Sequence, residues 1–213
     1  MTHSELSAQV ARGLLRIGAI RIQPEQPFKW ASGWNSPVYT DNRLILAHPE
    51  FRELICRAFI ELIESENLEP EVIAGVATGA IAHGMLVADR LKLPYAYIRP
   101  KPKMHGLGNQ VEGAPVEGKR VVVLEDLVST GKSSLAAVTA VEKSGGSVLA
   151  LMSIFNYGFE ESKKLFAAQN LPVHYLCNLE AVLQQARLAG DLTKTQLELV
   201  QQFRQSPATY GTR

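Results

Sequence analysis

The residues whose types and spacing best suit chemistry lie between positions 120 and 134. Four apolar residues, 121–124, are followed by the adjacent carboxylates Glu125 and Asp126 and then by a short turn rich in hydroxyl groups. The apolar run predicts a buried strand, and residues 133–144 predict a helix. Open α/β sheets bind ligands at the carboxyl ends of their strands, and the free amides at a helix start favour an anion. The segment therefore predicts a site for one phosphate group beside two acids.

A P-loop for nucleoside triphosphates is the first alternative, because residues 130–133 match the end of the pattern G-x-x-x-x-G-K-[ST]. That pattern needs a glycine five residues before Gly131, and the residue there is Asp126, whose carboxylate would repel a polyphosphate. Paired acids beside a phosphate instead suit the hydroxyls of a sugar ring or positive charge that develops on it. We therefore expect a ribose 5-phosphate group; the alternative is that Asp126 only caps the following helix.

A second segment, residues 99–118, combines positive charge with breakers of regular structure. Three of its first five residues are basic, and it contains four glycines and three prolines. A mobile cationic loop suits a departing pyrophosphate, because it can close, exclude water and neutralise the leaving group. The alternatives are a solvated surface loop and a nucleic-acid surface. The second is disfavoured because the loop lacks interleaved aromatic residues and the formal net charge of the chain is only +1.

Composition limits the class of protein. The 213 residues are 46% hydrophobic and 20% charged, which predicts one buried domain with an appendage rather than disorder. The two cysteines, Cys56 and Cys177, have no metal-ligand spacing and are expected to be reduced thiols. We expect no secretory leader, and no apolar run approaches the ~18 residues of a membrane span. A cytoplasmic protein without membrane or nucleic-acid partners is the expectation.

Apolar runs alternate with helical patterns along the chain, which predicts an α/β fold with a mainly parallel sheet. The expected strands are 72–77, 95–98, 121–124, 148–155 and 173–176, and the expected helices between and before them are 5–18, 49–66, 81–91, 133–144 and 159–169. Two further helices are expected within 179–205. Residues 27–48 and 99–118 have no sustained period, and such long irregular segments are commonly functional.

Residues 121–134 resemble the phosphoribosyl-diphosphate signature of type I phosphoribosyltransferases: an apolar strand, two acids and a small residue–Thr–Gly turn. The resemblance implies a domain over residues 1–178, with a small N-terminal hood formed largely by about 1–48, and a helical extension over 179–213. It implies that the two acids face the ribose hydroxyls, with Asp126 catalytic. The residues that it assigns to the ribose phosphate are Glu125, Asp126, Leu127, Val128, Ser129, Thr130, Gly131, Lys132 and Ser133.

The cationic segment narrows this resemblance to the orotate phosphoribosyltransferase family. The family pattern R-x-K-x-K-x-H-G-x-G is matched by Arg99, Lys101, Lys103, His105, Gly106 and Gly108. In that family the loop reaches into the active site of the other subunit of a dimer. The resemblance therefore implies a homodimer in which Arg99, Lys103 and His105 bind the diphosphate across the interface, with Lys103 the principal catalytic cation. Residues 28–43 also resemble the family's S-G-x-x-S-P element, which borders the orotate site.

Four positions depart from one branch of the family and resemble a second branch instead. Where the first branch has a basic side chain, this chain has Ala31, Gly79 (after Thr78), Pro100 and Tyr157. These differences leave open which side chain holds the orotate carboxylate. Ser129 is the first candidate, and Arg43 is the second.

The implied reaction joins orotate to phosphoribosyl diphosphate and yields orotidine monophosphate and pyrophosphate, a step of pyrimidine biosynthesis. Magnesium is expected to be carried mainly by the diphosphate, with no metal ligands from protein side chains. His83 and His174 are expected in the core and His48 at a helix start, while Trp30 and Trp34 either stack on a base or pack. Two alternatives are a phosphoribosyltransferase for a purine or uracil, and a non-catalytic regulator that senses a nucleotide and binds RNA. A regulator need not retain the cationic loop.

Overall fold

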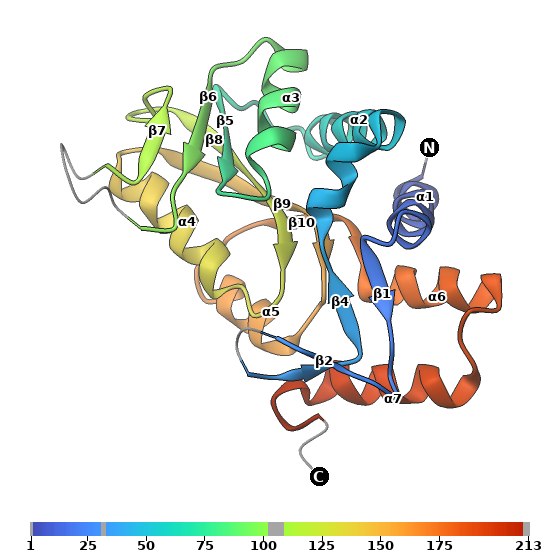
Figure 1. Cartoon of the computed structure of the whole chain (residues 1–213). Coiled ribbons are helices and arrows are strands. Elements are labelled where there is room, and N and C mark those ends of the chain that lie inside the picture. The colour runs from blue at the N-terminus through green and yellow to red at the C-terminus, as the bar shows by residue number, and fades with distance from the viewer. Residues whose placement is uncertain (1, 31–32, 102–108, 211–213) are drawn as a thin grey trace.

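The structure is a computed structural model, and it describes residues 2–30, 33–101 and 109–210 (Figure 1). Within these residues the main sheet has six strands in the order β10-β9-β8-β5-β6-β7. All neighbouring pairs are parallel except β6 and β7, which are antiparallel. The predicted α/β fold with a mainly parallel sheet is therefore confirmed.

The predicted strands and helices all exist; strand 95–98 and helix 81–91 have the predicted limits, and the limits of the others differ. The strands of the main sheet are β5 (Val72–Val76), β6 (Tyr95–Ile98), β7 (Val111–Gly113), β8 (Arg120–Val128), β9 (Ser147–Asn156) and β10 (Val173–Asn178). The helices are α1 (His3–Arg16), α2 (Pro49–Ser65), α3 (Ile81–Leu91), α4 (Lys132–Lys143), α5 (Glu160–Ala167), α6 (Leu179–Ala189) and α7 (Lys194–Gln205). Helix α1 begins two residues earlier than predicted, because Thr2 and Glu5 form a capping box.

Strand β8 is longer than the apolar run that predicted it. The run ends at Leu124, but the strand continues to Val128 because Leu127 and Val128 pair with the last residues of β9. Glu125 and Asp126 therefore lie within the strand and not after it. Since successive side chains of a strand point to opposite faces, the two acids face different surroundings.

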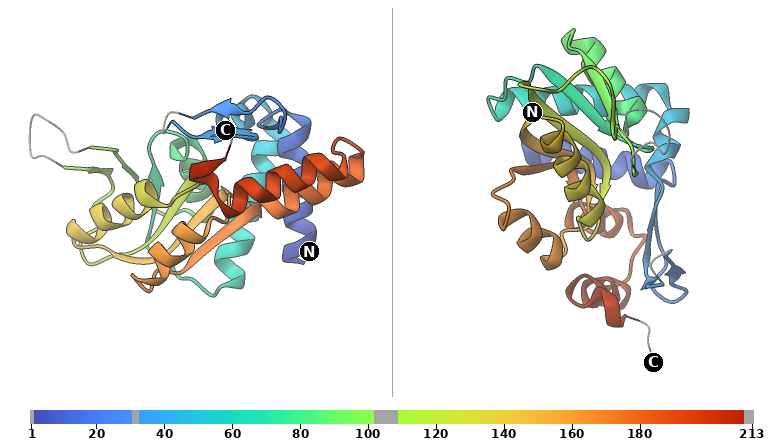
Figure 2. Two further views of the ribbon diagram at one scale, coloured as in Figure 1. Left: turned by 90° about the horizontal axis from the view of Figure 1, so that it is seen from below. Right: turned by 90° about the vertical axis from the view of Figure 1, so that its left-hand side faces the viewer.

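Helices cover both faces of the sheet (Figures 1 and 2). On β8, Val122 and Leu124 belong to the core that includes α1, α2, α3, α6 and α7. Val121 and Val123 face the smaller core formed with α4 and α5. The unbroken apolar run thus reflects burial on both sides.

The segment 27–48, predicted as irregular, forms much of a small separate layer, the hood. Here β1 (Ile20–Ile22) pairs antiparallel with β4 (Val38–Thr40), and β2 (Phe28–Lys29) pairs with β3 (Asn35–Ser36). A 3-10 helix, η1 (Asn42–Ala47), joins the hood to α2. Strands of two or three residues are too short to show a period in the sequence, which explains why no element was predicted here.

The C-terminal helices follow the sheet directly. Asn178 ends β10, and its side chain accepts a hydrogen bond from Ala181 N at 2.9 Å, which caps α6. Helix α7 runs alongside the hood and is followed by a short 3-10 helix, η2 (Pro207–Thr209) (Figures 1 and 2). The domain boundary at residue 178 stays a prediction. No helix in the described ranges is long and apolar enough to cross a membrane.

Three histidine predictions have different outcomes. His83 on α3 is buried, as predicted. His174 is not a core residue: it is partly exposed, and its Nδ1 lies 3.3 Å from Glu66 Oε1. His48 is at the N-cap position of α2, but its side chain makes no capping hydrogen bond.

Candidate active site

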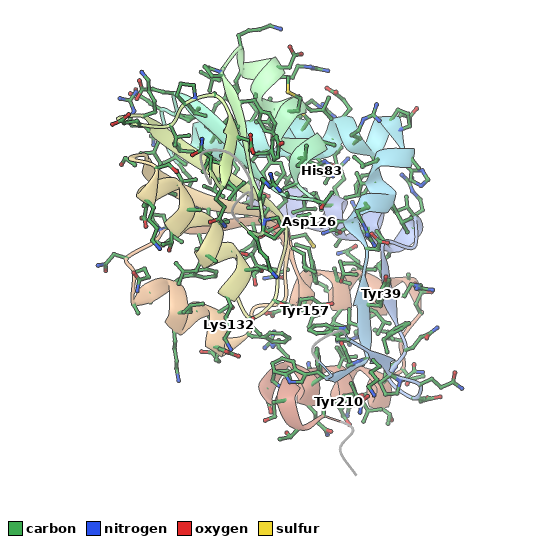
Figure 3. All side chains as sticks on the ribbon, turned by 60° about the vertical axis from the view of Figure 1, so that its left-hand side comes forward. Tyr39, His83, Asp126, Lys132, Tyr157 and Tyr210 are labelled. Carbon is green, nitrogen blue, oxygen red and sulfur yellow. The ribbon has the colours of Figure 1, made fainter. Side chains whose placement is uncertain are left out.

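The order of the strands defines the place of a crevice. From β5 the chain moves to β6 on one side, and it then returns to β8 on the other side and continues to β9 and β10. The segments that follow β5 and β8 therefore diverge between two adjacent strands, which is where open α/β sheets bind ligands. Asp126 lies at this point, between His83 and Tyr157 in the view of Figure 3.

Asp126 is positioned on two sides, by the backbone of Gly79 and by the side chain of Asn42. A Cβ placed on Gly79, in the loop after β5, would overlap the Asp126 carboxylate, so glycine permits this close approach. On the other side Asn42 Nδ2 donates a hydrogen bond to the carbonyl oxygen of Asp126 at 2.6 Å. The carboxylate itself is partly exposed and available to a ligand in the crevice.

Glu125 is in a different environment from its neighbour. It is buried, accepts a hydrogen bond from Ser134 Oγ at 3.3 Å and accepts another from Asp126 N at 3.0 Å. Burial, together with the Asp126 carboxylate, raises the pKa of Glu125 well above its ordinary value of 4.5. The carboxyl group thus ties β8 to the first turn of α4, and its contact with ribose stays a prediction.

The predicted turn from strand to helix is present. Gly131 has φ of 82° and is the N-cap residue of α4, which begins at Lys132, one residue earlier than predicted. A Cβ on Gly131 would lie 2.6 Å from the Phe166 ring, so both conformation and space require glycine. In the described part of the chain no side chain caps α4, and its first amides remain available to an anion beside the hydroxyls of Ser129 and Thr130.

A cavity of about 590 Å³ adjoins this turn and extends under the hood. Its wall has four aromatic side chains, two lysines and several hydroxyl groups: Lys29, Trp30, Trp34, Tyr39, Thr40, Leu127, Ser129, Thr130, Lys132 and Tyr157. The volume and the aromatic wall suit a small planar ring. Ser129 and Thr130 belong both to the turn and to this cavity, so the two sites are continuous.

The candidates for the orotate carboxylate are in different places. Ser129 lines the cavity. The Arg43 guanidinium, by contrast, pairs with Asp41 at 2.7 Å, is largely exposed and does not line the cavity. Tyr157 is buried, and its hydroxyl group lies 2.9 Å from Thr40 Oγ1, so it joins the end of β9 to the hood.

Sequence reasoning missed Lys29 and Thr40 as residues of the cavity, and Asn42 as a support of Asp126. One signal for Lys29 was available: it lies two residues before Ala31, a position where one branch of the family has lysine. Lys132 was assigned to the phosphate, and it also lines the cavity. Its Nζ lies 2.8 Å from Glu161 Oε1, whereas no ion pair of Lys29 is found among the residues described.

The cationic loop is described only at its base. Arg99 directly follows β6 and pairs with Glu112 of β7 at 3.3 Å, and Gln110 Nε2 donates to Arg99 O at 2.9 Å. Lys103 and His105 lie outside the described residues. In the described ranges no three His, Cys, Asp or Glu side chains gather as metal ligands. Cys56 and Cys177 are buried free thiols.

A hydroxyl-rich turn at a helix start and an acid at the switch point of a parallel sheet, beneath a small hood, are typical of the phosphoribosyltransferase class. Residues 42–172 match the family of the phosphoribosyl transferase domain. The chain is 49% identical over 205 residues to an orotate phosphoribosyltransferase of Lactococcus lactis subsp. cremoris strain SK11, a match that covers 96% of this chain and 98% of that protein. The chain belongs to the orotate phosphoribosyltransferase family.

Solved structures agree with this assignment. A crystal structure of orotate phosphoribosyltransferase from Aeropyrum pernix matches with a TM-score of 0.74 and 28% identity, over 84% of this chain and 98% of that one. The structure of Leishmania donovani UMP synthase matches with a TM-score of 0.78 and 23% identity, over 93% of this chain but 42% of that one. The second match shows a shared fold with less than half of a longer chain.

Proposed function

We propose that this protein transfers a phosphoribosyl group to orotate and releases pyrophosphate, with orotidine 5'-phosphate as the product. The observation that carries the proposal is the continuity of the hydroxyl-rich turn with an aromatic cavity that has two lysines in its wall. The turn suits the 5-phosphate of the donor, and the cavity suits a planar base. Orotate carries a carboxylate, so lysines at the base favour it over uracil or a purine.

Each part of the donor has a corresponding group. The amides at the start of α4 and the hydroxyls of Ser129 and Thr130 bind the 5-phosphate. Asp126 accepts hydrogen bonds from the ribose hydroxyls and stabilises positive charge that develops on the ring as the bond to pyrophosphate breaks. The base in the cavity then lies beside the anomeric carbon, and positioning of the two substrates accounts for a large share of the rate.

The leaving group is negatively charged and needs cations. Arg99, Lys103 and His105 of the cationic loop neutralise it, with Lys103 the principal catalytic residue. Magnesium carried by the diphosphate would add to this neutralisation, and the Asp126 carboxylate and the hydroxyls of the turn are oxygen donors suited to such a hydrated cation.

The active form in this proposal is a homodimer whose loops act across the interface. Three large apolar side chains on η1 and α3 support it, because Leu44, Leu46 and Met85 are between 36% and 48% exposed. A second subunit that covers them would remove this apolar surface from water. The cytoplasm is the proposed location, in keeping with the two unpaired thiols.

The direct test is an assay of the purified protein with orotate, phosphoribosyl diphosphate and magnesium. The reaction is monitored by the loss of orotate absorbance. Parallel assays with uracil, hypoxanthine and adenine decide the base. We expect turnover with orotate alone. Turnover of another base in its place would make the protein a phosphoribosyltransferase of different specificity, and no turnover with any base would favour the nucleotide-sensing regulator.

A further inference from the structure

The C-terminal helix α7 contributes to a group of aromatic rings behind the proposed base cavity. We call this group the aromatic brace; it consists of Trp30, Tyr157, Phe159, Phe203 and Tyr210. Its members come from the hood, from the end of β9 and from the C-terminal segment, which are far apart in the sequence. Tyr157, Phe159 and Phe203 are each at most 1% exposed.

Phe203 of α7 is in contact with the other four rings. Its centroid lies 5.8 Å from that of Trp30 and 6.4 Å from that of Tyr157, both in edge-to-face geometry. It lies 5.5 Å from Phe159 and 5.4 Å from Tyr210. Trp30 and Tyr157, themselves 5.1 Å apart, line the cavity, so Phe203 supports two of its walls from behind.

Polar contacts join the same C-terminal segment to the hood. The Tyr210 hydroxyl donates to Pro24 O at 3.2 Å, and Gln196 Nε2 donates to Glu25 Oε1 at 3.2 Å. In Figures 1 and 2, the C-terminal end of α7 and the segment after it lie near the β2–β3 hairpin. Helix α7 therefore contacts the hood in two ways: the Phe203 ring packs against Trp30, and Gln196 donates a hydrogen bond to Glu25.

The hood has little support of its own at this point. Strands β2 and β3 pair through two residues each, and a ladder of that length is not stable by itself. Within the hood, Trp30 Nε1 donates to Val38 O at 3.3 Å. On the side of the sheet, the Tyr157 hydroxyl lies 2.9 Å from Thr40 Oγ1, and the Phe159 ring packs against Trp30 and Trp34. Further support comes from Phe203 of α7 and from the segment after it.

We propose that α7 positions the aromatic walls of the base cavity through Phe203, and that the C-terminal helix is thereby part of the base-binding site. Phe203 is a positioning residue: it does not line the cavity, and it acts through Trp30 and Tyr157. The inference rests on the proposed function in that the cavity is the site of the base. It predicts an effect on binding of the base and not on binding of the ribose phosphate, because the turn at 129–131 lies outside the brace.

The chain offers a direct reporter, because both of its tryptophans, Trp30 and Trp34, are in the hood hairpin. In the full-length Phe203→Ala variant we expect tryptophan emission to shift to longer wavelength and the quenching by added orotate to weaken. The KM for orotate should rise between about tenfold and a hundredfold, as for a misplaced binding group. The KM for phosphoribosyl diphosphate should stay near the wild-type value. Phe203→Leu, which keeps apolar volume, should recover most of the loss.

The matched control is Phe59→Ala. Phe59 on α2 is also fully buried, and none of the ring contacts found in the described ranges joins it to the aromatic brace. This variant should lose thermal stability but keep the emission maximum and the KM for orotate. Equal changes in the two variants would mean that Phe203 contributes general stability, and the inference would be wrong.

Two outcomes separate this inference from the proposed function. If the wild-type protein neither binds nor converts orotate, the proposed function fails, but the emission shift of Phe203→Ala still tests the support of the hood. If Phe203→Ala does not fold, Tyr210→Phe takes its place, since it removes one hydrogen bond and keeps the ring. A smaller change in the same direction supports the inference, and unchanged emission with unchanged KM for orotate overturns it.

Discussion

The α-carbon of Gly79 lies directly against the carboxylate of Asp126, with no room for a side chain between them. The two residues belong to the loop after β5 and the end of β8, the adjacent strands between which the strand order reverses. This contact sets how far the carboxylate extends into the crevice. The acid that we propose to contact the ribose ring is thus positioned by packing against backbone.

The first prediction concerns this contact. Gly79→Ala should displace the Asp126 carboxylate and lower kcat/KM by roughly a hundredfold, as misplacement by about 1 Å can do. Gly146→Ala is the control, because its Cβ would lie 2.8 Å from Val141 Cγ1, in the core between α4 and β9 and away from the crevice. It should cost about 1–3 kcal/mol in the free energy of unfolding and leave kcat/KM nearly unchanged. Equal kinetic loss in both variants would contradict the role given to Gly79.

The second prediction distinguishes the two acids. Burial raises the pKa of Glu125 and so favours its neutral form, and Glu125→Gln puts a neutral group of similar shape in its place. Asp126→Asn removes a charge at the crevice. We expect kcat to fall about 10²–10³-fold in Asp126→Asn and only slightly in Glu125→Gln. Steady-state kinetics at saturating donor test this, and the reverse order of effects would exchange the two roles.

The third prediction concerns stability against acid. Burial lowers the pKa of His83 from 6.5 to about 4, with Asp126 acting in the opposite direction and Arg52 in the same one. Between these values the unfolded chain binds a proton that the folded protein does not, so stability present above pH 6.5 is lost as the pH falls toward 4. His83→Leu removes this contribution. As the pH falls from 7 to 4, the free energy of unfolding of the wild type should therefore decrease by roughly 3 kcal/mol more than that of the variant. Denaturant unfolding at a series of pH values measures both curves. If the two curves run parallel, the prediction is wrong.

The fourth prediction concerns the orotate carboxylate. Lys29 and Lys132 both line the cavity, but Glu161 partly neutralises Lys132. Lys29→Ala should raise the KM for orotate about 10–100-fold, the loss of one hydrogen bond to a charged group, with little change in the KM for the donor. Lys132→Ala should have the smaller effect on orotate. If instead Ser129→Ala alone raises this KM, the hydroxyl group and not a lysine holds the carboxylate.

The fifth prediction tests the shared active site. Lys103→Ala and Asp126→Asn should each be nearly inactive. In a mixed dimer, one site combines the intact Asp126 of one subunit with the intact Lys103 of the other. Mixing the two variants under conditions of subunit exchange should therefore restore up to about a quarter of the wild-type activity. Without any recovery, although mixed dimers are present, the loop would act within its own subunit.

Predictions from local patterns succeeded where one element and its neighbour in sequence decide the structure. The apolar run before Glu125, the hydroxyl-rich turn and the glycine at 131 are enough to define a strand, a turn and a helix start. The predicted end of β8 was wrong, because the last residues of this strand pair with β9. The sequence pattern of β8 alone cannot reveal this pairing. The prediction that His174 is a core residue was wrong for a related reason, since its surroundings include Glu66, which directly follows α2.

The sequence alone determined the class of this protein: a hydroxyl-rich turn after a buried strand, two adjacent acids and a cationic segment, each contained in one short stretch. The tertiary structure decided which acid faces the crevice and which residues line the cavity. Those residues come from the hood, from β8 and its turn and from the end of β9, with Phe203 behind them. Contacts between segments so far apart depend on the whole fold, and strands of two or three residues have no period from which such contacts can be predicted.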